Sequence, residues 1–452
     1  MLKIARRLSA ARTDEDPDAG FSIVEVLVAT VIFMLLSIGI AQATVTSIRL
    51  SGDQKHRVTA LSLAASEIDT VRAIGDPFKV QTLDPPNTVT IDGTTYTINR
   101  DTEWVSGTGT DIPCGGSGTA NLQVKRVNVS VTWTGQLVNT NPVSSDTVLA
   151  PIGRINDPTQ GTIIVAATQA DGTGSAGVTP TITPVSGGAT ALTTAPPATD
   201  SDGCSYALRV TPGVYKVALS KAGYIDVTQN PTPSLNVTVV AGSTVSAPFG
   251  YDLAAKFTMT YAPGQPAGTK FATNAETSFV NTYGTFYVGG TGTSTSLYPW
   301  GIGYVPMAGH YILPTASSAG CRSVDPSEWD ADPTAGPPLA DGDHGAPTAT
   351  GPGGTAAMTV RMGLLKVKST KAGTLTATSA TAPAAWNDPG CGTAMTYTFT
   401  GIAANTDTYI ALPFGTWALS VPSASLTLTP LNNVVSGRVS GSTVMLDPRP
   451  AA

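Results

Sequence analysis

Charged residues are scarce in this sequence. They make up 12% of its 452 residues, and the formal net charge is −6. Proteins that bind nucleic acid neutralise its phosphates with clustered Lys and Arg side chains. No basic stripe of that kind occurs beyond the first 20 residues. We therefore expect no nucleic-acid partner.

Histidine is also rare, and the common catalytic motifs are missing. The three histidines, His56, His310 and His344, are far apart in the chain, and no GxSxG, HExxH or P-loop string occurs. Such strings bring a nucleophile, a base or a phosphate-binding loop together, so their absence argues against the corresponding chemistry. The sequence predicts no catalytic residues, no enzymatic activity and no cofactor, which disfavours an envelope-anchored hydrolase.

Cysteine occurs only four times, and no pair has the CxxC spacing of zinc or thioredoxin-type sites. An even number of cysteines in an exported chain indicates disulfides formed in an oxidising compartment. Four cysteines allow three connectivities, and proximity in sequence favours pairing the first with the second and the third with the fourth. The candidate residues are Cys114, Cys204, Cys321 and Cys391.

One long apolar run lies near the N-terminus. A polar, charged segment of residues 1–20 is followed by mostly apolar residues from Phe21 to Ala43, with a single carboxylate at Glu25. About 20 apolar residues are enough to cross a bilayer as a helix. A carboxylate at the centre of such a helix costs about 2.5–3.5 kcal/mol, so Glu25 needs shallow depth or a partner.

The order of residues around this run argues against an ordinary secretory signal. Such signals are cleaved at small residues that follow the apolar core, whereas Gly20 precedes it. The basic residues of the leader keep the N-terminus in the cytoplasm. An uncleaved signal anchor is an alternative, because Glu25 lies close enough to the helix start to reach the headgroups.

Gly20, Phe21 and Glu25 together resemble the type IV prepilin signature. The resemblance implies that prepilin peptidase cuts after Gly20 and that the new amine of Phe21 is methylated. It also implies assembly with other pilin or pseudopilin subunits. In such a bundle, the Glu25 carboxylate of one subunit pairs with the N-terminal amine of a neighbour, so that its burial cost is recovered on assembly.

The helical pattern continues beyond the apolar run. Apolar residues recur at intervals of three and four up to Ile74, Gly75 provides a C-cap, and Pro77 prevents continuation. The sequence predicts an assembly helix over residues 21–75 and a β head over residues 76–157. The expected helix face comprises Val58, Leu61, Ala65, Ile68, Val71 and Ile74, and the clearest strand alternates through Val127, Val129, Val131 and Trp133.

Strand and turn patterns fill the remainder of the chain. The segment 199–226, with its Asp200–Gly203 turn, its Pro212-Gly213 turn and the alternating strand from Tyr215, resembles transthyretin-like, carboxypeptidase-regulatory-like β-sandwiches. We expect one such module at 158–254, a related one at 363–452 and a β-rich module of uncertain fold at 255–362. The predicted class is α+β: a long pilin-type helix packed on an antiparallel sheet, followed by all-β sandwich modules of Ig-like or transthyretin-like type.

Two clusters in the distal half are candidate binding sites. Acidic loop residues could hold calcium, which prefers six to eight oxygen ligands, although acidic turn residues are also common in solvated loops. An aromatic group could stack on sugars or fill a sandwich core. The acidic candidates are Asp325, Glu328, Asp330, Asp332, Asp341 and Asp343, and the aromatic ones are Tyr298, Trp300, Tyr304 and Tyr311.

The predicted function is structural. We expect a minor pilin or pseudopilin that assembles through its N-terminal helix into a type IV pilus-like or secretion-related fibre, at the tip because several extra sandwiches would crowd a packed shaft. The helix would hold the protein in the cytoplasmic membrane before assembly, and the fibre would present it at the cell surface. The alternative is a membrane-anchored adhesin that binds a glycan or another surface ligand through its distal β modules.

Overall fold

The computed structural model describes residues 22–83, 85–106, 111–112, 114, 122–136, 141–150, 158–381, 385–431 and 438–452. Gly20 and Phe21 lie outside these residues. The chain divides into two compact units. The first comprises Met1–Ile74, Pro85–Asp101 and Val127–Thr147; the second comprises Gly75–Asp84, Thr102–Arg126 and Val148–Ala452.

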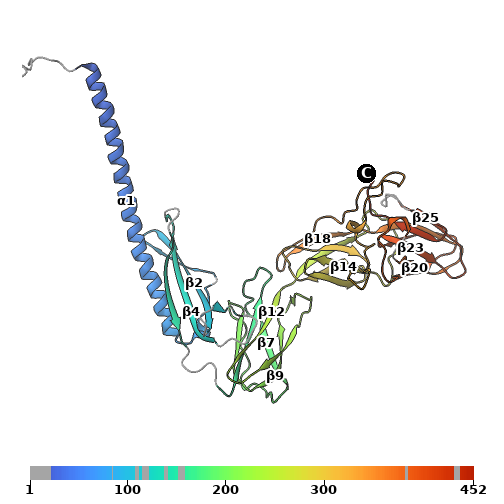
Figure 1. The fold of residues 1–452 in the computed structure, drawn as a ribbon, viewed down its shortest axis with the longest axis horizontal. Helices are drawn as coiled ribbons and strands as arrows, with labels where there is room; N and C mark the ends of the chain where they lie inside the picture. The colour runs from blue at the N-terminus through green and yellow to red at the C-terminus, as the bar shows by residue number, and fades with distance from the viewer. Residues whose placement is uncertain are drawn as a thin grey trace, which may run out of the picture. The chain divides into compact units, whose positions relative to one another are not determined.

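A single long helix, α1 (Ile23–Ile74), begins the described chain (Figure 1). Every residue from Ser22 to Leu50 is exposed, and this apolar half is long and apolar enough to cross a membrane by length and composition. The helix ends as predicted: Gly75 has a φ of +69°, a left-handed conformation that glycine adopts without strain. Asp76 then caps a short 3₁₀ helix, η1 (Pro77–Lys79).

In the first unit, the second half of α1 packs on a sheet through a face that matches the predicted one only in part: Ile68 and Val71 are buried as predicted, and the other four predicted residues are exposed. The buried helix residues are Ala60, Ala64, Ile68 and Val71, whereas Val58 and Leu61 are 68% and 56% exposed, and Ala65 and Ile74 are exposed too. Apolar residues lie on two adjacent helix faces, and periodicity alone does not choose between them. The sheet lies on the face whose alanines allow close approach.

The head sheet contains five strands in the order β1-β2-β4-β5, with β3 paired to β2. The predicted alternation of strand β4 is confirmed, because Val127, Val129, Val131 and Trp133 are all buried. Arg100 on β2 pairs with Glu67 of the helix at 2.7 Å. The strands are β1 (Asn87–Ile91), β2 (Thr94–Ser106), β3 (Asp111–Ile112), β4 (Leu122–Trp133) and β5 (Val143–Leu149).

Strands β2 and β4 extend from the first unit into the second, where their ends lie with the first β-sandwich. That sandwich consists of the sheets β10-β12-β6-β8 and β11-β9-β7, and its first and last strands, β6 and β12, pair in parallel. Tyr215, Val217 and Leu219 are buried, as the alternation predicts. The strands are β6 (Gly161–Thr168), β7 (Thr179–Ser186), β8 (Cys204–Val210), β9 (Gly213–Ser220), β10 (Tyr224–Asp226), β11 (Ser234–Val239) and β12 (Thr244–Leu253).

The region of uncertain fold also contains two sheets, β16-β13-β18 and β15-β14-β17. Its core includes Phe257, Phe279, Tyr304 and Met358, and its first and last strands again pair in parallel. The strands are β13 (Ala255–Tyr261), β14 (Glu276–Asn281), β15 (Gly284–Gly289), β16 (Ser294–Leu297), β17 (Val305–Ala308) and β18 (Thr355–Val360), and the 3₁₀ helix η2 (Pro326–Glu328) lies in the loop before β18.

The C-terminal module is formed by the sheets β22-β19-β24 and β21-β20-β23-β26-β25. Its core contains Leu365, Val367, Trp417, Leu419 and Val421, the residues that the sequence pattern predicts to face inward. The strands are β19 (Gly363–Ser369), β20 (Gly373–Ser379), β21 (Thr396–Ile402), β22 (Asp407–Leu412), β23 (Gly415–Ser420), β24 (Leu426–Pro430), β25 (Arg438–Ser440) and β26 (Thr443–Leu446), with the 3₁₀ helix η3 (Ala385–Asn387) after β20.

The two sandwiches that the sequence pattern relates share one unusual glycine. Gly213 begins β9 and Gly415 begins β23, with φ angles of +151° and +135°. A Cβ atom added at Gly213 would lie 2.5 Å from the backbone nitrogen of Ala189. The same turn-into-strand geometry therefore requires glycine in both modules.

Replacing Ala64 by Leu tests the observed helix face. Ala64 is fully buried and the adjacent Ala65 is exposed, so the two positions form a matched pair. We expect Ala64→Leu to destabilise the head by about 1–3 kcal/mol through overpacking, and Ala65→Leu to change it by less than about 0.5 kcal/mol. Hydrogen exchange of α1 and β4 amides in the detergent-solubilised chain measures both effects. Equal protection in the two variants would contradict this packing.

Candidate functional site

The apolar half of α1 carries one charged side chain between Ile23 and Ile48, that of Glu25 in the first turn. A carboxylate at this end of a helix is favoured by the helix dipole. The hydroxyl groups of Thr30, Thr44 and Thr46 donate to helix carbonyl oxygens at 2.8 Å, so they need no water. Among the described residues, no side chain pairs with the Glu25 carboxylate.

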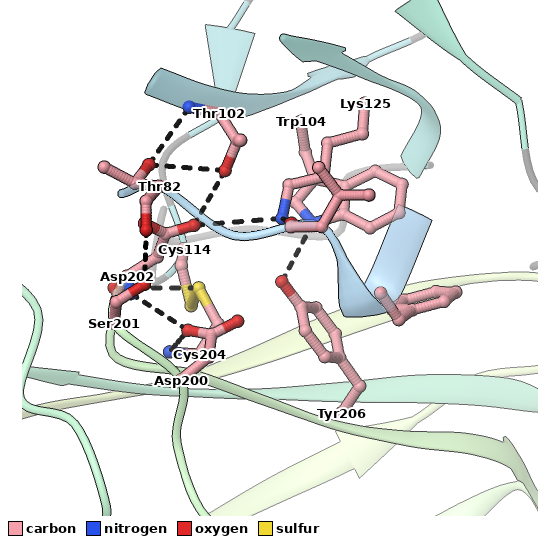
Figure 2. Close-up of polar contacts among 12 residues, drawn as sticks. Thr82, Thr102, Trp104, Cys114, Lys125, Asp200, Ser201, Asp202, Cys204 and Tyr206 are labelled. Carbon is pink, nitrogen blue, oxygen red and sulfur yellow. Dashed lines mark hydrogen bonds and ion pairs between the residues drawn. A yellow bond between two sulfur atoms is a disulfide. The ribbon is translucent and has the colours of Figure 1, made fainter. Parts of the chain in front are cut away.

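A second site lies within the second unit, where the ends of β2 and β4 meet the turn before β8 (Figure 2). We call it the junction cluster and define it by its members: Trp104, Cys114, Lys125, Asp200, Asp202, Cys204 and Tyr206. Lys125 is 1% exposed. Its Nζ donates to the carbonyl oxygen of Val80 at 2.6 Å and lies 3.8 Å from Oδ2 of Asp202.

The turn of the junction cluster is held by hydrogen bonds to one carboxylate. Oδ1 of Asp200 accepts from the backbone N–H groups of Asp202 at 3.1 Å and Cys204 at 2.8 Å. Gly203 has a φ of +77°, and a side chain there would collide with the backbone of Ala167. The Asp-Gly turn predicted from the sequence therefore also fixes the position of Asp202 relative to Lys125.

Burial governs the electrostatics of this cluster. Desolvation raises the pKa of Asp200; its backbone hydrogen bond to Cys204 opposes that shift, Asp202 adds to it and Lys125 opposes it. A raised carboxyl pKa means that the folded protein binds this proton more readily than the unfolded chain. Asp200 therefore opposes folding at neutral pH, and this opposition fades as the pH falls through its folded pKa towards the ordinary value.

Aromatic rings and a disulfide enclose the buried lysine. Nε1 of Trp104 donates to the Tyr206 hydroxyl at 2.9 Å, the Phe78 ring packs against both, and Lys125 Nζ lies 5.7 Å from the centre of the Trp104 ring. Burial and the carboxylates of Asp200 and Asp202 raise the pKa of Tyr206. A buried cation in such surroundings costs several kcal/mol unless it is compensated.

The disulfides follow the pairing that proximity in sequence favours. Cys114 is bonded to Cys204, and Cys321 to Cys391. The first bond belongs to the junction cluster. Sequence reasoning missed the cluster itself, although a signal was present: Lys125 has the same parity as Val127, Val129 and Val131, which places a lysine on the inward face of β4.

The acidic candidates are not gathered into a metal site. The described ranges contain no group of three or more His, Cys, Asp or Glu side chains that could hold a metal ion. Instead, the carboxylates act locally: that of Asp325 caps η2, that of Glu328 pairs with Arg322, that of Asp332 pairs with Arg438, and those of Asp341 and Asp343 accept from backbone N–H groups. The Asp330 carbonyl oxygen accepts from Arg449. The geometry gives the calcium hypothesis no support.

The aromatic candidates mainly form core. Tyr298, Tyr304 and Tyr311 are buried, and Trp300 is half-buried. Among the described residues from 158 onward, the exposed rings are those of Tyr283 and Tyr287 at the β14–β15 hairpin, which the sequence analysis did not select. Tyr283 is 62% exposed and stacks on Trp300 at 3.8 Å between ring centres. Tyr287 stacks on His310 at 4.0 Å.

Comparisons with known proteins give little beyond this geometry. No protein-family model matches the chain, and no curated protein matches it significantly. Among solved structures, the Bacillus anthracis TIE protein aligns with 80% of this chain and 66% of its own, just under two thirds, at 10% identity and a TM-score of 0.18. A streptococcal ancillary pilin aligns with 52% of this chain and 76% of its own, at 9% identity and a TM-score of 0.19. TM-scores this low do not establish a shared fold.

Replacing Tyr206 by Phe tests the hydrogen bond inside the junction cluster. The change leaves the buried Nε1 of Trp104 without its acceptor, and a lost buried partner costs about 1–3 kcal/mol. We expect faster hydrogen exchange of β8 amides than in the wild type. Tyr283→Phe, at an exposed ring, serves as the control and should leave exchange in β8 unchanged. If β8 amides exchanged in Tyr206→Phe at the wild-type rate, the hydrogen bond from Trp104 to Tyr206 would contribute nothing to stability.

Proposed function

We propose that this chain is a structural subunit of the prepilin type, a minor pilin or pseudopilin that assembles through α1 into a type IV pilus-like or secretion-related fibre. One observation carries the proposal. The apolar half of α1 is exposed along its whole length, has Glu25 near its start and continues into the half that packs on the head sheet.

The dimensions of α1 support a membrane-held precursor. At 1.5 Å per residue, the exposed stretch from Ile23 to Leu50 is about 40 Å long, whereas the hydrocarbon core of a bilayer is about 30 Å thick. The threonine hydroxyls in this stretch are satisfied within the helix. We propose that α1 holds the protein in the cytoplasmic membrane until a prepilin peptidase cuts between Gly20 and Phe21.

The carboxylate of Glu25 favours assembly of this helix with its neighbours. In a membrane, its carboxylate is costly unless it lies near the surface or meets a cation. Cleavage before Phe21 would create such a cation, the N-terminal amine, only four residues from Glu25. We propose that the amine of one subunit pairs with the Glu25 carboxylate of its neighbour, so that the ion pair forms between subunits.

The bulk of the β modules favours a place at the fibre tip. Three sandwiches follow the head in every copy, and a packed shaft would have to accommodate all of them. A single copy at the end avoids this crowding. In this role the chain acts by assembly and display, without catalysis.

A second candidate function, adhesion, is favoured by the exposed rings of the β14–β15 hairpin. Tyr283 and Tyr287 are both solvent-exposed and each is held by a stacked partner. Rigid exposed rings can stack on the apolar faces of sugars. We propose this hairpin as the contact for a glycan or surface ligand if the protein acts as an adhesin.

Processing is tested by the mass of the mature N-terminus. In cells that possess a prepilin peptidase, we expect the purified protein to begin at Phe21 and to carry one added methyl group on its amine. Gly20→Leu should block cleavage and retain residues 1–20. Mass spectrometry of the N-terminal peptide distinguishes the two forms. An intact leader on the wild-type protein would contradict the proposal.

Assembly is tested by removing the carboxylate of Glu25. We expect Glu25→Ala to leave the protein in the membrane and to lower its amount in sheared fibres at least about tenfold, because one ion pair of about 1.4 kcal/mol corresponds to a factor of ten. Ser37→Ala, a polar-to-alanine change in the same apolar half, serves as the control. Quantitative immunoblots of fibre and membrane fractions provide the measurement. If the Glu25→Ala variant entered fibres in the same amount as the wild type, the proposed role of this carboxylate would be wrong.

A further inference from the structure

The buried amine of Lys125 faces a carboxylate without forming a close hydrogen bond to it. The distance from Nζ to Oδ2 of Asp202 is 3.8 Å, beyond the range of about 2.7–2.9 Å for charge-assisted hydrogen bonds. Nζ donates instead to the Val80 carbonyl oxygen at 2.6 Å, and Asp202 Oδ2 accepts from the Thr102 hydroxyl at 2.8 Å. Both groups are thus held by other partners, with the amine nitrogen 3.8 Å from a carboxylate oxygen of Asp202.

We propose that Lys125 and Asp202 condense into an amide, an isopeptide bond between Nζ and Cγ that joins strand β4 to the turn before β8. Both residues lie in the same compact unit. The bond would lie beside the Cys114–Cys204 disulfide (Figure 2). It would be an intramolecular modification, independent of assembly into a fibre.

The reaction balances without any added reagent. In the ion pair, Nζ carries three protons and the Asp202 carboxylate carries none. Transfer of one proton gives a neutral amine and a neutral carboxyl group, and the amine lone pair attacks Cγ. One C–O bond then breaks, and its oxygen leaves as water with two of the three protons. The third proton stays on the amide nitrogen, and nothing is oxidised or reduced.

The surroundings favour the uncharged product. Lys125 is 1% exposed. The rings of Trp104, Tyr206 and Phe78 pack together, and the Trp104 ring lies beside the Lys125 amine. Keeping an ion pair in such surroundings costs several kcal/mol per ion, whereas an amide carries no charge. Holding two reacting groups together also replaces a bimolecular step with an intramolecular one, which can lower a barrier by about 7–11 kcal/mol.

Asp200 positions the turn that carries Asp202. Its carboxylate binds the backbone N–H of Asp202 at 3.1 Å, and it interacts electrostatically with both Asp202 and Lys125. In this role Asp200 is a positioning residue, and the bond itself forms between Lys125 and Asp202.

The intact mass of the full chain tests the bond. After export, purification in detergent, reduction and alkylation, we expect the wild-type protein to be lighter than its processed sequence by one water molecule. Lys125→Met and Asp202→Ala should each have their full sequence mass. Asp202→Asn should condense with loss of ammonia and be lighter by one ammonia molecule. Formation of the Cys114–Cys204 disulfide before reduction shows that each variant has folded around the site.

Peptide mapping locates the linkage. Trypsin does not cleave after an acylated lysine, so the wild type should yield one branched peptide that contains both Lys125 and Asp202. Fragment ions must place the lost water at these two residues, since a dehydration elsewhere would leave them in separate peptides. A wild-type chain of full mass, cleaved after Lys125, would overturn the proposal and show that the pair remains an ion pair. A variant Asp202→Asn of full mass would equally count against it.

Discussion

The apolar half of α1 has to be covered by something other than the described part of this chain. From Ser22 to Leu50 every residue is exposed, and an apolar surface of this size is not tolerated on a soluble monomer. The hydrocarbon of a bilayer meets this requirement, and in the assembly proposed above the equivalent helices of other subunits would meet it too. Moving α1 from lipid into a bundle of such helices would change its hydrophobic free energy little. The charge of Glu25 would then have a large influence on whether the helix leaves the lipid.

The division between the two compact units falls within strands of the head sheet. Strands β2 and β4 begin or end in one compact unit and continue in the other, and the junction cluster ties their ends to β8. A lysine on the inward face of β4 is tolerable only because Val80 and Asp202 meet it there. Burial of the Lys125 charge costs free energy unless these partners are in place, so the fold that positions them is favoured over folds that do not.

Local sequence patterns predicted the helix end and the buried faces of strands. The features that they missed depend on contacts between residues distant in the sequence. Alternation identified the buried face of β4 and of β9, and Gly75 marked the helix end. On the helix face, Ile68 and Val71 were predicted correctly, and Val58 and Leu61 were wrong. Ala60 and Ala64 form an equally regular spacing of three or four residues with the confirmed pair, and only the partner sheet distinguishes the two sets. The junction cluster joins residues about 75–100 positions apart, which no spacing rule detects. The buried Arg449–Asp447 ion pair was missed for a related reason: the Arg449 guanidinium carbon lies 5.2 Å from the centre of the Trp329 ring, which is distant in the sequence.

The parallel pairing of first and last strands has a mechanical consequence. In the first sandwich, β6 and β12 run side by side in the same direction, from Thr162 beside Thr244 to Thr168 beside Gly250. The chain therefore enters this module at one end and leaves it at the other. Tension applied through the two ends would pull the strands past each other and load their hydrogen bonds together, not one after another as in peeling. A second module with the same pairing, between β13 and β18, would respond in the same way.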